Sequence, residues 1–134
     1  MKLRLFLYGF AGWLIATVAL RFWGQFVLRP GDWIRTLTVF ALSFPLMALL
    51  VRRLCSGLRL RDGEWLSGAL MVLLPTLLLD PFSSAFFPTA FPNMSPDVAG
   101  VFGGWMLWCC AGALVGAAIP SSAKDGHAAH SAGR

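Results

Sequence analysis

The chain has 134 residues, of which 57% are hydrophobic and 13% are charged, and its mean hydropathy is +0.70. Soluble domains carry about 25% charged residues, so this composition excludes an ordinary water-soluble fold and indicates an integral membrane protein. A net charge of +5 would suggest nucleic-acid binding in a soluble protein. Here the basic residues flank apolar stretches, where they anchor helices and contact anionic lipid. We therefore expect the lipid bilayer as a partner and no nucleic acid.

The hydropathy pattern predicts four transmembrane helices, because each span needs about 20 mostly apolar residues. We expect these helices at residues 5–28, 34–51, 65–79 and 98–119. Lys2 and Arg4 precede the first apolar run, as in a signal peptide. No small-residue cleavage site follows that run, so we expect an uncleaved first helix. The fold class is then all-α, with residues 1–119 as one up-down four-helix bundle and 120–134 as a disordered cytoplasmic tail.

Polar residues recur at the outer end of the first predicted helix. Arg21, Gln25 and Arg29 are spaced by four and share a helix face. Arginine at the bilayer centre costs at least about 2.5 kcal/mol, so such side chains face the bundle or extend to the headgroups. Asp80 ends the third predicted span at a similar depth. We expect either an Arg21–Asp80 ion pair beside a polar pocket, or an Arg21 that reaches headgroups while Asp80 caps the turn before Pro81.

Proline interrupts two of the predicted spans. Pro45 lies in the second span and Pro75 in the third. Each proline removes a backbone hydrogen bond, so we expect a helix kink at both positions. Paired broken helices can mark a transport site near the membrane midplane, although single prolines are also common in spans without transport.

The segment DPFSSAFFPTAFPNMSPD, residues 80–97, separates the last two predicted helices. It holds too many prolines for one helix and too many phenylalanines for a freely solvated loop. We expect a Pro/Phe-rich extracytoplasmic loop that forms either a lid over the bundle or an ordinary interfacial connector. Ser95 as N-cap, Pro96 at the first helical position and Asp97 near the positive end of the dipole predict where the fourth helix begins.

The fourth predicted helix carries two pairs of glycines with small-xxx-small spacing, which are Gly100, Gly104, Gly112 and Gly116. Glycine allows close approach of helix backbones, which is how membrane helices gain packing energy. The two pairs do not fall on one straight helix face. They predict packing within the bundle or, alternatively, homodimerisation.

No residue set has the spacing of a catalytic, cofactor-binding or metal site. Cys55, Cys109 and Cys110 form neither a disulfide framework nor a zinc pattern. His127 and His130 lie in the predicted tail without further ligands. We therefore expect no catalytic residue, no cofactor and no bound metal, and we do not expect an enzyme.

The distribution of basic residues predicts the orientation, because cytoplasmic flanks are enriched in lysine and arginine. One side would hold Lys2, Arg4, Arg52, Arg53, Arg59, Arg61, Lys124 and Arg134. The other side would hold Arg21, Arg29 and Arg35. The richer side is expected to be cytoplasmic, so both termini should lie in the cytoplasm.

The stretches FPNMSPDVAGVFGGWMLWC, from Phe91 to Cys109, and LFLYGFAGWLIATVALRFWGQ, from Leu5 to Gln25, resemble a family of small bacterial four-span membrane proteins of unknown function. The resemblance implies an inner (plasma) membrane location and a multi-pass topology. It implies no activity, substrate or site residue.

Three classes of function agree with these features. The first is a non-enzymatic membrane protein that packs against itself or a larger membrane-protein partner as an assembly or accessory subunit. The second is a small-solute or ion transporter that acts as an oligomer. One observation argues against it: proton-coupled transporters usually need a carboxylate at mid-membrane, and the sequence places none there. The third is a membrane enzyme acting on lipid or thiol substrates.

Overall fold

The computed structural model describes residues 1–120 and consists of helices and connecting turns over that range. Its elements are α1 (Lys2–Val27), α2 (Trp33–Gly57), η1 (Asp62–Glu64), α3 (Trp65–Ala85), α4 (Phe87–Ala90), η2 (Pro96–Val98) and α5 (Ala99–Ala118). Four helices, counted with the 3-10 turns that precede α3 and α5, are long and apolar enough to cross a membrane. The all-helical fold class is therefore confirmed. Residues 121–134, which hold His127, His130 and nearly all of the expected tail, lie outside the described residues.

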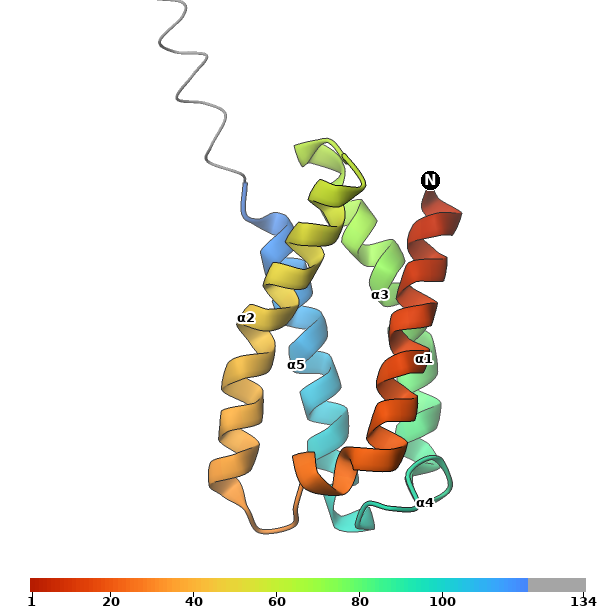
Figure 1. The fold of residues 1–134 in the computed structure, drawn as a ribbon, viewed down its shortest axis with the longest axis vertical. Coiled ribbons are helices and arrows are strands. Elements are labelled where there is room, and N and C mark those ends of the chain that lie inside the picture. The colour runs from red at the N-terminus through yellow and green to blue at the C-terminus, as the bar shows by residue number, and fades with distance from the viewer. Residues whose placement is uncertain (121–134) are drawn as a thin grey trace, which may run out of the picture.

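Consecutive long helices run in opposite directions, and the N-terminus lies at the same end of the bundle as the end of α5 (Figure 1). The most extensive contacts join α2 to α5, α1 to α3, and α3 to α5. By contrast, α1 and α2 barely touch. The four helices thus form a bent row in the order α1, α3, α5, α2, with a lateral gap between its two ends.

Two expected helix ends are wrong. The second helix continues from Val51 to Gly57 because its polar last turns still form backbone hydrogen bonds, and it stops only where Arg59 adopts a left-handed φ of 53°. There the amides of Arg59 and Leu60 donate to the carbonyls of Ser56 and Cys55, the hydrogen-bond pattern of a Schellman motif.

The third helix continues past the expected end at Leu79 to Ala85, with Pro75 and Pro81 inside it. In an apolar surrounding, each unpaired backbone group costs several kcal/mol. A helix that loses one bond at Pro81 is therefore more stable than a loop that would lose several. This extension moves Asp80 from the predicted loop into the helix.

Buried apolar side chains form two separate clusters. One joins α2, α3 and α5 at the end of the bundle that holds the N-terminus, and comprises Val51, Cys55, Trp65, Ala69, Leu73, Cys110, Ala113 and Ala117. The other lies at the opposite end and comprises Leu20, Leu28, Phe87, Phe91, Met94, Val98 and Phe102. The region between the clusters is where the candidate site lies.

Candidate functional site: a carboxylate in a cavity between the helices

Asp80 projects from α3 toward α1 and binds Trp13. The indole Nε1 of Trp13 donates a hydrogen bond of 2.8 Å to Oδ1 of Asp80. The second oxygen, Oδ2, is buried and has no hydrogen-bond partner. Because a carboxylate can accept about four hydrogen bonds, most of the accepting capacity of Asp80 is unused. Trp13 lies near the middle of α1, so the carboxylate sits level with the centre of that helix.

A cavity of about 440 Å³ opens beside this carboxylate. We call it the central cavity; all four long helices line it, and its walls are mostly apolar. Leu73 and Cys110 of one buried cluster and Leu20 and Phe102 of the other border it, so the cavity separates the two clusters. Among its lining residues, Asp80 is the only charged one.

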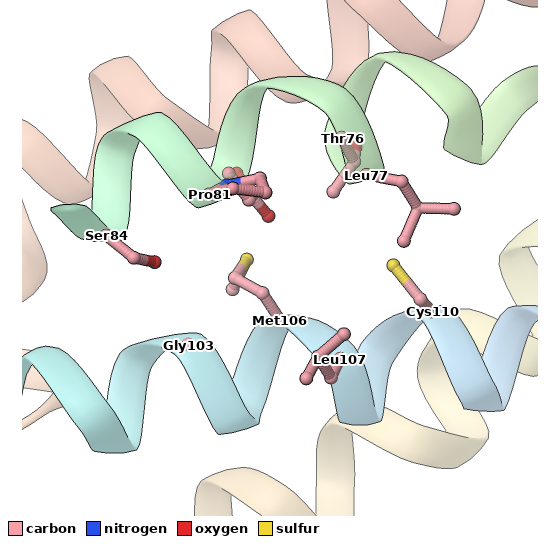
Figure 2. A pocket seen from close by; sticks show the side chains of 9 residues that line it. Thr76, Leu77, Pro81, Ser84, Gly103, Met106, Leu107 and Cys110 are labelled. Carbon is pink, nitrogen blue, oxygen red and sulfur yellow. The ribbon is translucent and has the colours of Figure 1, made fainter.

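A second, smaller hollow of about 170 Å³ lies on the other side of Asp80, between α3 and α5. Figure 2 shows the side chains of Pro81 and Ser84 on α3 facing Met106 and Cys110 on α5 across this crevice. Asp80 lines both the crevice and the central cavity. Its carboxylate therefore stands between two hollows that lie at the middle of α5.

The Arg21–Asp80 ion pair, one of the two alternatives, does not form, and Asp80 does not cap a turn because α3 continues through Pro81. Both N–H···O contacts of Arg21 run from Nη1 to the carbonyls of Thr89, at 3.2 Å, and Ala90, at 2.8 Å. Trp13, the partner of Asp80, precedes Arg21 by eight residues, which is about 12 Å along a helix. The two charges lie at different levels because α3 continues to Ala85. Asp80 is therefore several residues before the end of α3 and lies level with the middle of α1.

The polar stripe on α1 holds the connector, residues 86–98, rather than lining the central cavity. Gln25 accepts a hydrogen bond from the Asn93 amide, and Asn93 also donates to the carbonyl of Leu20 at 3.1 Å. Arg29 lies beyond the end of α1 at Val27, so it does not share the helix face that the sequence predicted, and its Nε donates only to the carbonyl of Gln25 at 3.4 Å.

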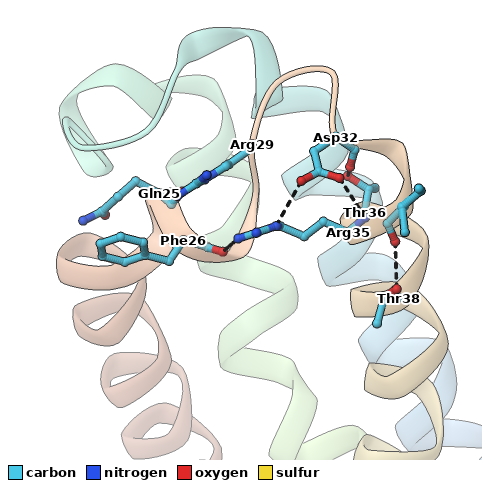
Figure 3. Close-up of polar contacts among 8 residues, drawn as sticks. Gln25, Phe26, Arg29, Asp32, Arg35, Thr36 and Thr38 are labelled. Carbon is cyan, nitrogen blue, oxygen red and sulfur yellow. Dashed lines mark hydrogen bonds and ion pairs between the residues drawn. The ribbon is translucent and has the colours of Figure 1, made fainter.

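The turn between α1 and α2 contains the single ion pair among residues 1–120. Asp32 caps α2 by accepting from the Arg35 amide at 3.1 Å and pairs with its guanidinium at 3.2 Å (Figure 3). Arg35 also donates to the carbonyl of Phe26 at the end of α1. Asp32 and Arg35 were not expected in this role, although an aspartate just before an apolar run is a recognisable N-cap signal.

Three phenylalanine side chains form a cluster at the end of the central cavity that Phe102 lines. The rings of Phe87, Phe91 and Phe102 lie 4.9 to 5.4 Å apart between centroids. All three are buried, whereas Phe82 and Phe86 are each 65% exposed. The connector thus packs Phe87 and Phe91 against the cavity residue Phe102. Ser95 accepts a hydrogen bond from the Asp97 amide, as expected for the start of the last helix.

The two glycine pairs of α5 have different surroundings. A Cβ on Gly112 would lie 2.7 Å from the backbone oxygen of Phe44, and one on Gly116 would lie 2.6 Å from the backbone of Ala48. This pair therefore packs against α2. A Cβ on Gly100 or Gly104 would meet nothing within 4 Å. No contact inside the described bundle therefore requires glycine at these two positions.

Pro45 and Pro75 both lie inside helices, as expected. The kinks at these positions stay a prediction. Neither proline lines the central cavity, so the broken-helix argument for transport finds no support from their positions.

The sequence reading missed Trp13, Tyr8, Trp105 and the two cysteines Cys109 and Cys110 as cavity residues. Tryptophan N–H groups need a partner when buried. Trp13 in the middle of one span and Asp80, the single acid at the end of an apolar stretch, could therefore have indicated this contact. Trp105 likewise donates to the Ser43 hydroxyl at 2.7 Å. Among the described residues, no three potential metal ligands come together.

This geometry defines an all-helical protein that has four helices long and apolar enough to cross a membrane and a cavity between them lined by one carboxylate. The chain belongs to a family of unknown function, DUF5367, whose model matches residues 27–124. The matched region includes Asp80 and excludes Trp13. Searches of curated proteins and of solved structures found no match.

Proposed function

We propose that this protein binds a small solute in the central cavity and carries it across a membrane. The observation that supports this proposal is the buried, unpartnered Oδ2 of Asp80 beside a cavity of about 440 Å³. Ionisable residues inside a membrane are costly, so they are rare and mark substrate or proton pathways. The sequence argument against a transporter was the lack of a mid-membrane carboxylate; the Trp13 contact, which puts Asp80 level with the middle of α1, supports the opposite view.

The size of the cavity suits a small organic molecule. Small-molecule sites are typically mostly apolar hollows of about 300–1,000 Å³ with a few convergent polar groups. The central cavity has this character, with Asp80 as the convergent group. We propose a non-enzymatic role, because the hydrogen-bond partner of Asp80 is an indole rather than a second acid or base.

The proposal is tested by filling the cavity. Ala16 lines the cavity from α1, and Ala11 lies on the same helix outside it; both are exposed. Purified wild-type protein, Ala16→Leu and Ala11→Leu are titrated with 1-naphthylmethylamine, 1-naphthylmethanol and 1-naphthoate. These probes share an aromatic body and differ in charge. Thermal unfolding in detergent and uptake into reconstituted vesicles are measured.

Binding and uptake of at least one probe by the wild type and by Ala11→Leu, with loss in Ala16→Leu, would support the proposal. Equal behaviour of the two leucine variants would contradict it, because ligand would then bind outside the cavity. Failure of all three probes to stabilise the wild type would also contradict it.

A second candidate is an assembly or accessory role through self-association. It is favoured by Gly100 and Gly104, where added side chains would meet open space, since exposed small-residue pairs bring membrane helices together. Oligomeric state in mild detergent is compared for the wild type, Gly100→Ile, Gly104→Ile and the control Ala118→Ile. A monomer in every case would exclude this surface as an interface.

We propose that the protein resides in a bacterial inner membrane with both termini in the cytoplasm. The support is that Arg52, Arg53, Arg59 and Arg61 lie at the same end of the bundle as Lys2 and Arg4. Alkaline phosphatase, which is active only outside the cytoplasm, is fused after Gly31 and after Arg59. Activity at Gly31 alone is expected, and activity at Arg59 alone would reverse the orientation.

A further inference from the structure

The walls of the central cavity favour one charge of ligand. Asp80 is the only charged side chain that lines it, and no lysine or arginine is among the lining residues. The aromatic side chains of Tyr8, Trp13, Phe102 and Trp105 also line it. The faces of such rings attract cations within about 6 Å of the ring centre. An anion would meet a carboxylate with no compensating positive group.

The hydrogen-bond state of Asp80 selects the ligand further. Oδ1 is held by Trp13, whereas Oδ2 is buried and empty of partners. A buried charge is stable only when it is paired and hydrogen-bonded. An ammonium group supplies both a positive charge and N–H donors, and a neutral alcohol supplies only one donor. The buried, unpaired Oδ2 therefore needs a hydrogen-bond donor, and a protonated amine satisfies it best.

The cavity is reached from the side of the bundle. Because α1 and α2 barely touch, the lining residues of α1 face Met47 and Leu50 of α2 across the lateral gap. On α1 this face carries Gly12 and Ala16, and a Cβ on Gly12 would meet nothing within 4 Å. Figure 1 shows these two helices apart, with α5 behind the gap. A ligand that enters here comes from the apolar phase, so it must itself carry a sizeable apolar body.

We propose that the central cavity binds lipophilic amine cations, with Asp80 as their counter-ion and the α1–α2 gap as their entrance. This inference rests on the proposed function and names the substrate class of the same site. Cation and proton compete for the one carboxylate, so binding a cation to protonated Asp80 breaks its O–H bond and releases one proton to solution. No other bond changes.

The competition sets the direction of the pH dependence. Affinity for the cation falls as the pH is lowered through the range in which Asp80 takes up a proton. The titratable groups facing the cavity besides Asp80 are Tyr8 on α1 and Cys109 and Cys110 on α5; α2 contributes none. These groups are neutral in their protonated forms and gain no charge on acidification.

The test compares the three naphthyl probes on wild type and on Asp80→Asn, which keeps an oxygen for the Trp13 indole and removes the charge. We expect the wild type to bind 1-naphthylmethylamine at least about tenfold more tightly than 1-naphthylmethanol. Asp80→Asn should abolish that preference while retaining the alcohol. Cation affinity of the wild type should fall on acidification, and alcohol affinity should not.

The outcomes separate the two proposals. Equal binding of amine and alcohol, both lost in Ala16→Leu, would overturn the cation inference and leave the small-solute proposal standing. Preference for 1-naphthoate would overturn it in the same way. Absence of binding by every probe would overturn both. Should Asp80→Asn fail to fold, the pH dependence of wild-type binding decides: a pH-independent cation affinity would overturn the inference.

Discussion

Trp13 donates its indole N–H to Oδ1 of Asp80 over 2.8 Å, and this bond joins the middle of α1 to the C-terminal half of α3. The bond also determines which oxygen remains available, because Oδ2 is left buried without a partner. Trp13 thus acts as a positioning residue. It holds the carboxylate at the edge of the central cavity.

Replacement of Trp13 by phenylalanine should destabilise the protein by about 1 kcal/mol. The change keeps an aromatic ring and removes the single donor to Asp80, and net hydrogen-bond contributions in proteins and in membrane bundles are of this size. Trp23, which is 61% exposed, provides the matched control Trp23→Phe. Unfolding is followed in detergent, and equal midpoints for the two variants would show that the Trp13–Asp80 bond contributes nothing to stability.

The four helices were predictable from sequence because long apolar runs have to bury their peptide groups in helices. The position of Asp80 was not. Asp80 and Pro81 together read as a helix end, and only the packed structure shows that α3 continues to Ala85. The central cavity was also beyond prediction, because it depends on the gap between α1 and α2, which no single helix encodes.

Alanine substitutions in α5 should change stability with opposite signs at Gly116 and Gly104. A Cβ at Gly116 would lie 2.6 Å from the backbone of Ala48. Because that backbone belongs to α2, it cannot easily move away. Overpacking of this kind costs about 1–3 kcal/mol. At Gly104 the Cβ would meet nothing, so the higher helix propensity of alanine should stabilise by up to about 1 kcal/mol. Chemical unfolding of both variants measures the two signs, and destabilisation at both sites would contradict the assignment.

The glycine spacing predicted close packing without indicating which pair performs it. Gly100, Gly104, Gly112 and Gly116 have the same local pattern. Their difference arises because α2 crosses α5 near Gly112 and Gly116 and leaves the other pair uncovered. Sequence periodicity describes one helix, whereas the crossing point depends on two.

Arg52 should contribute about 1–3 kcal/mol to stability. Its Nη1 donates to the carbonyls of Gly116, at 2.9 Å, and Ile119, at 2.8 Å, and its guanidinium lies 5.3 Å from the centre of the Trp65 ring. The last carbonyls of a helix otherwise lack partners, and hydrogen bonds from charged donors are the stronger kind. Arg52→Ala should therefore lower the unfolding midpoint.

The exposed neighbour Arg53 supplies the control for this prediction, because Arg53→Ala removes the same charge from the same turn of α2. Arg52→Lys should be intermediate, since a lysine keeps the charge but lacks the planar fork of donors. Similar losses for Arg52→Ala and Arg53→Ala would mean that net charge at this end of the bundle, rather than the contacts to α5, accounts for the effect.

Arg21 should hold the connector against α1. Its guanidinium donates to the carbonyls of Thr89 and Ala90, and Met94 of the connector, only 5% exposed, packs against Gly24. Loss of charge-assisted hydrogen bonds worth about 1.5 kcal/mol should raise the population of the opened connector about tenfold. A cysteine at Met94 reports this opening through its rate of modification by a membrane-impermeant maleimide.

We expect Arg21→Gln to speed labelling of Met94→Cys about tenfold. Arg29→Gln is the matched control, because Arg29 donates only to the carbonyl of Gln25 and not to the connector. Wild-type protein, with its three native cysteines, provides the background. Equal rates for the two glutamine variants would show that Arg21 does not restrain the connector. Faster labelling with Arg21→Gln alone would show that Arg21, for which an Asp80 pairing was one alternative, restrains the connector instead.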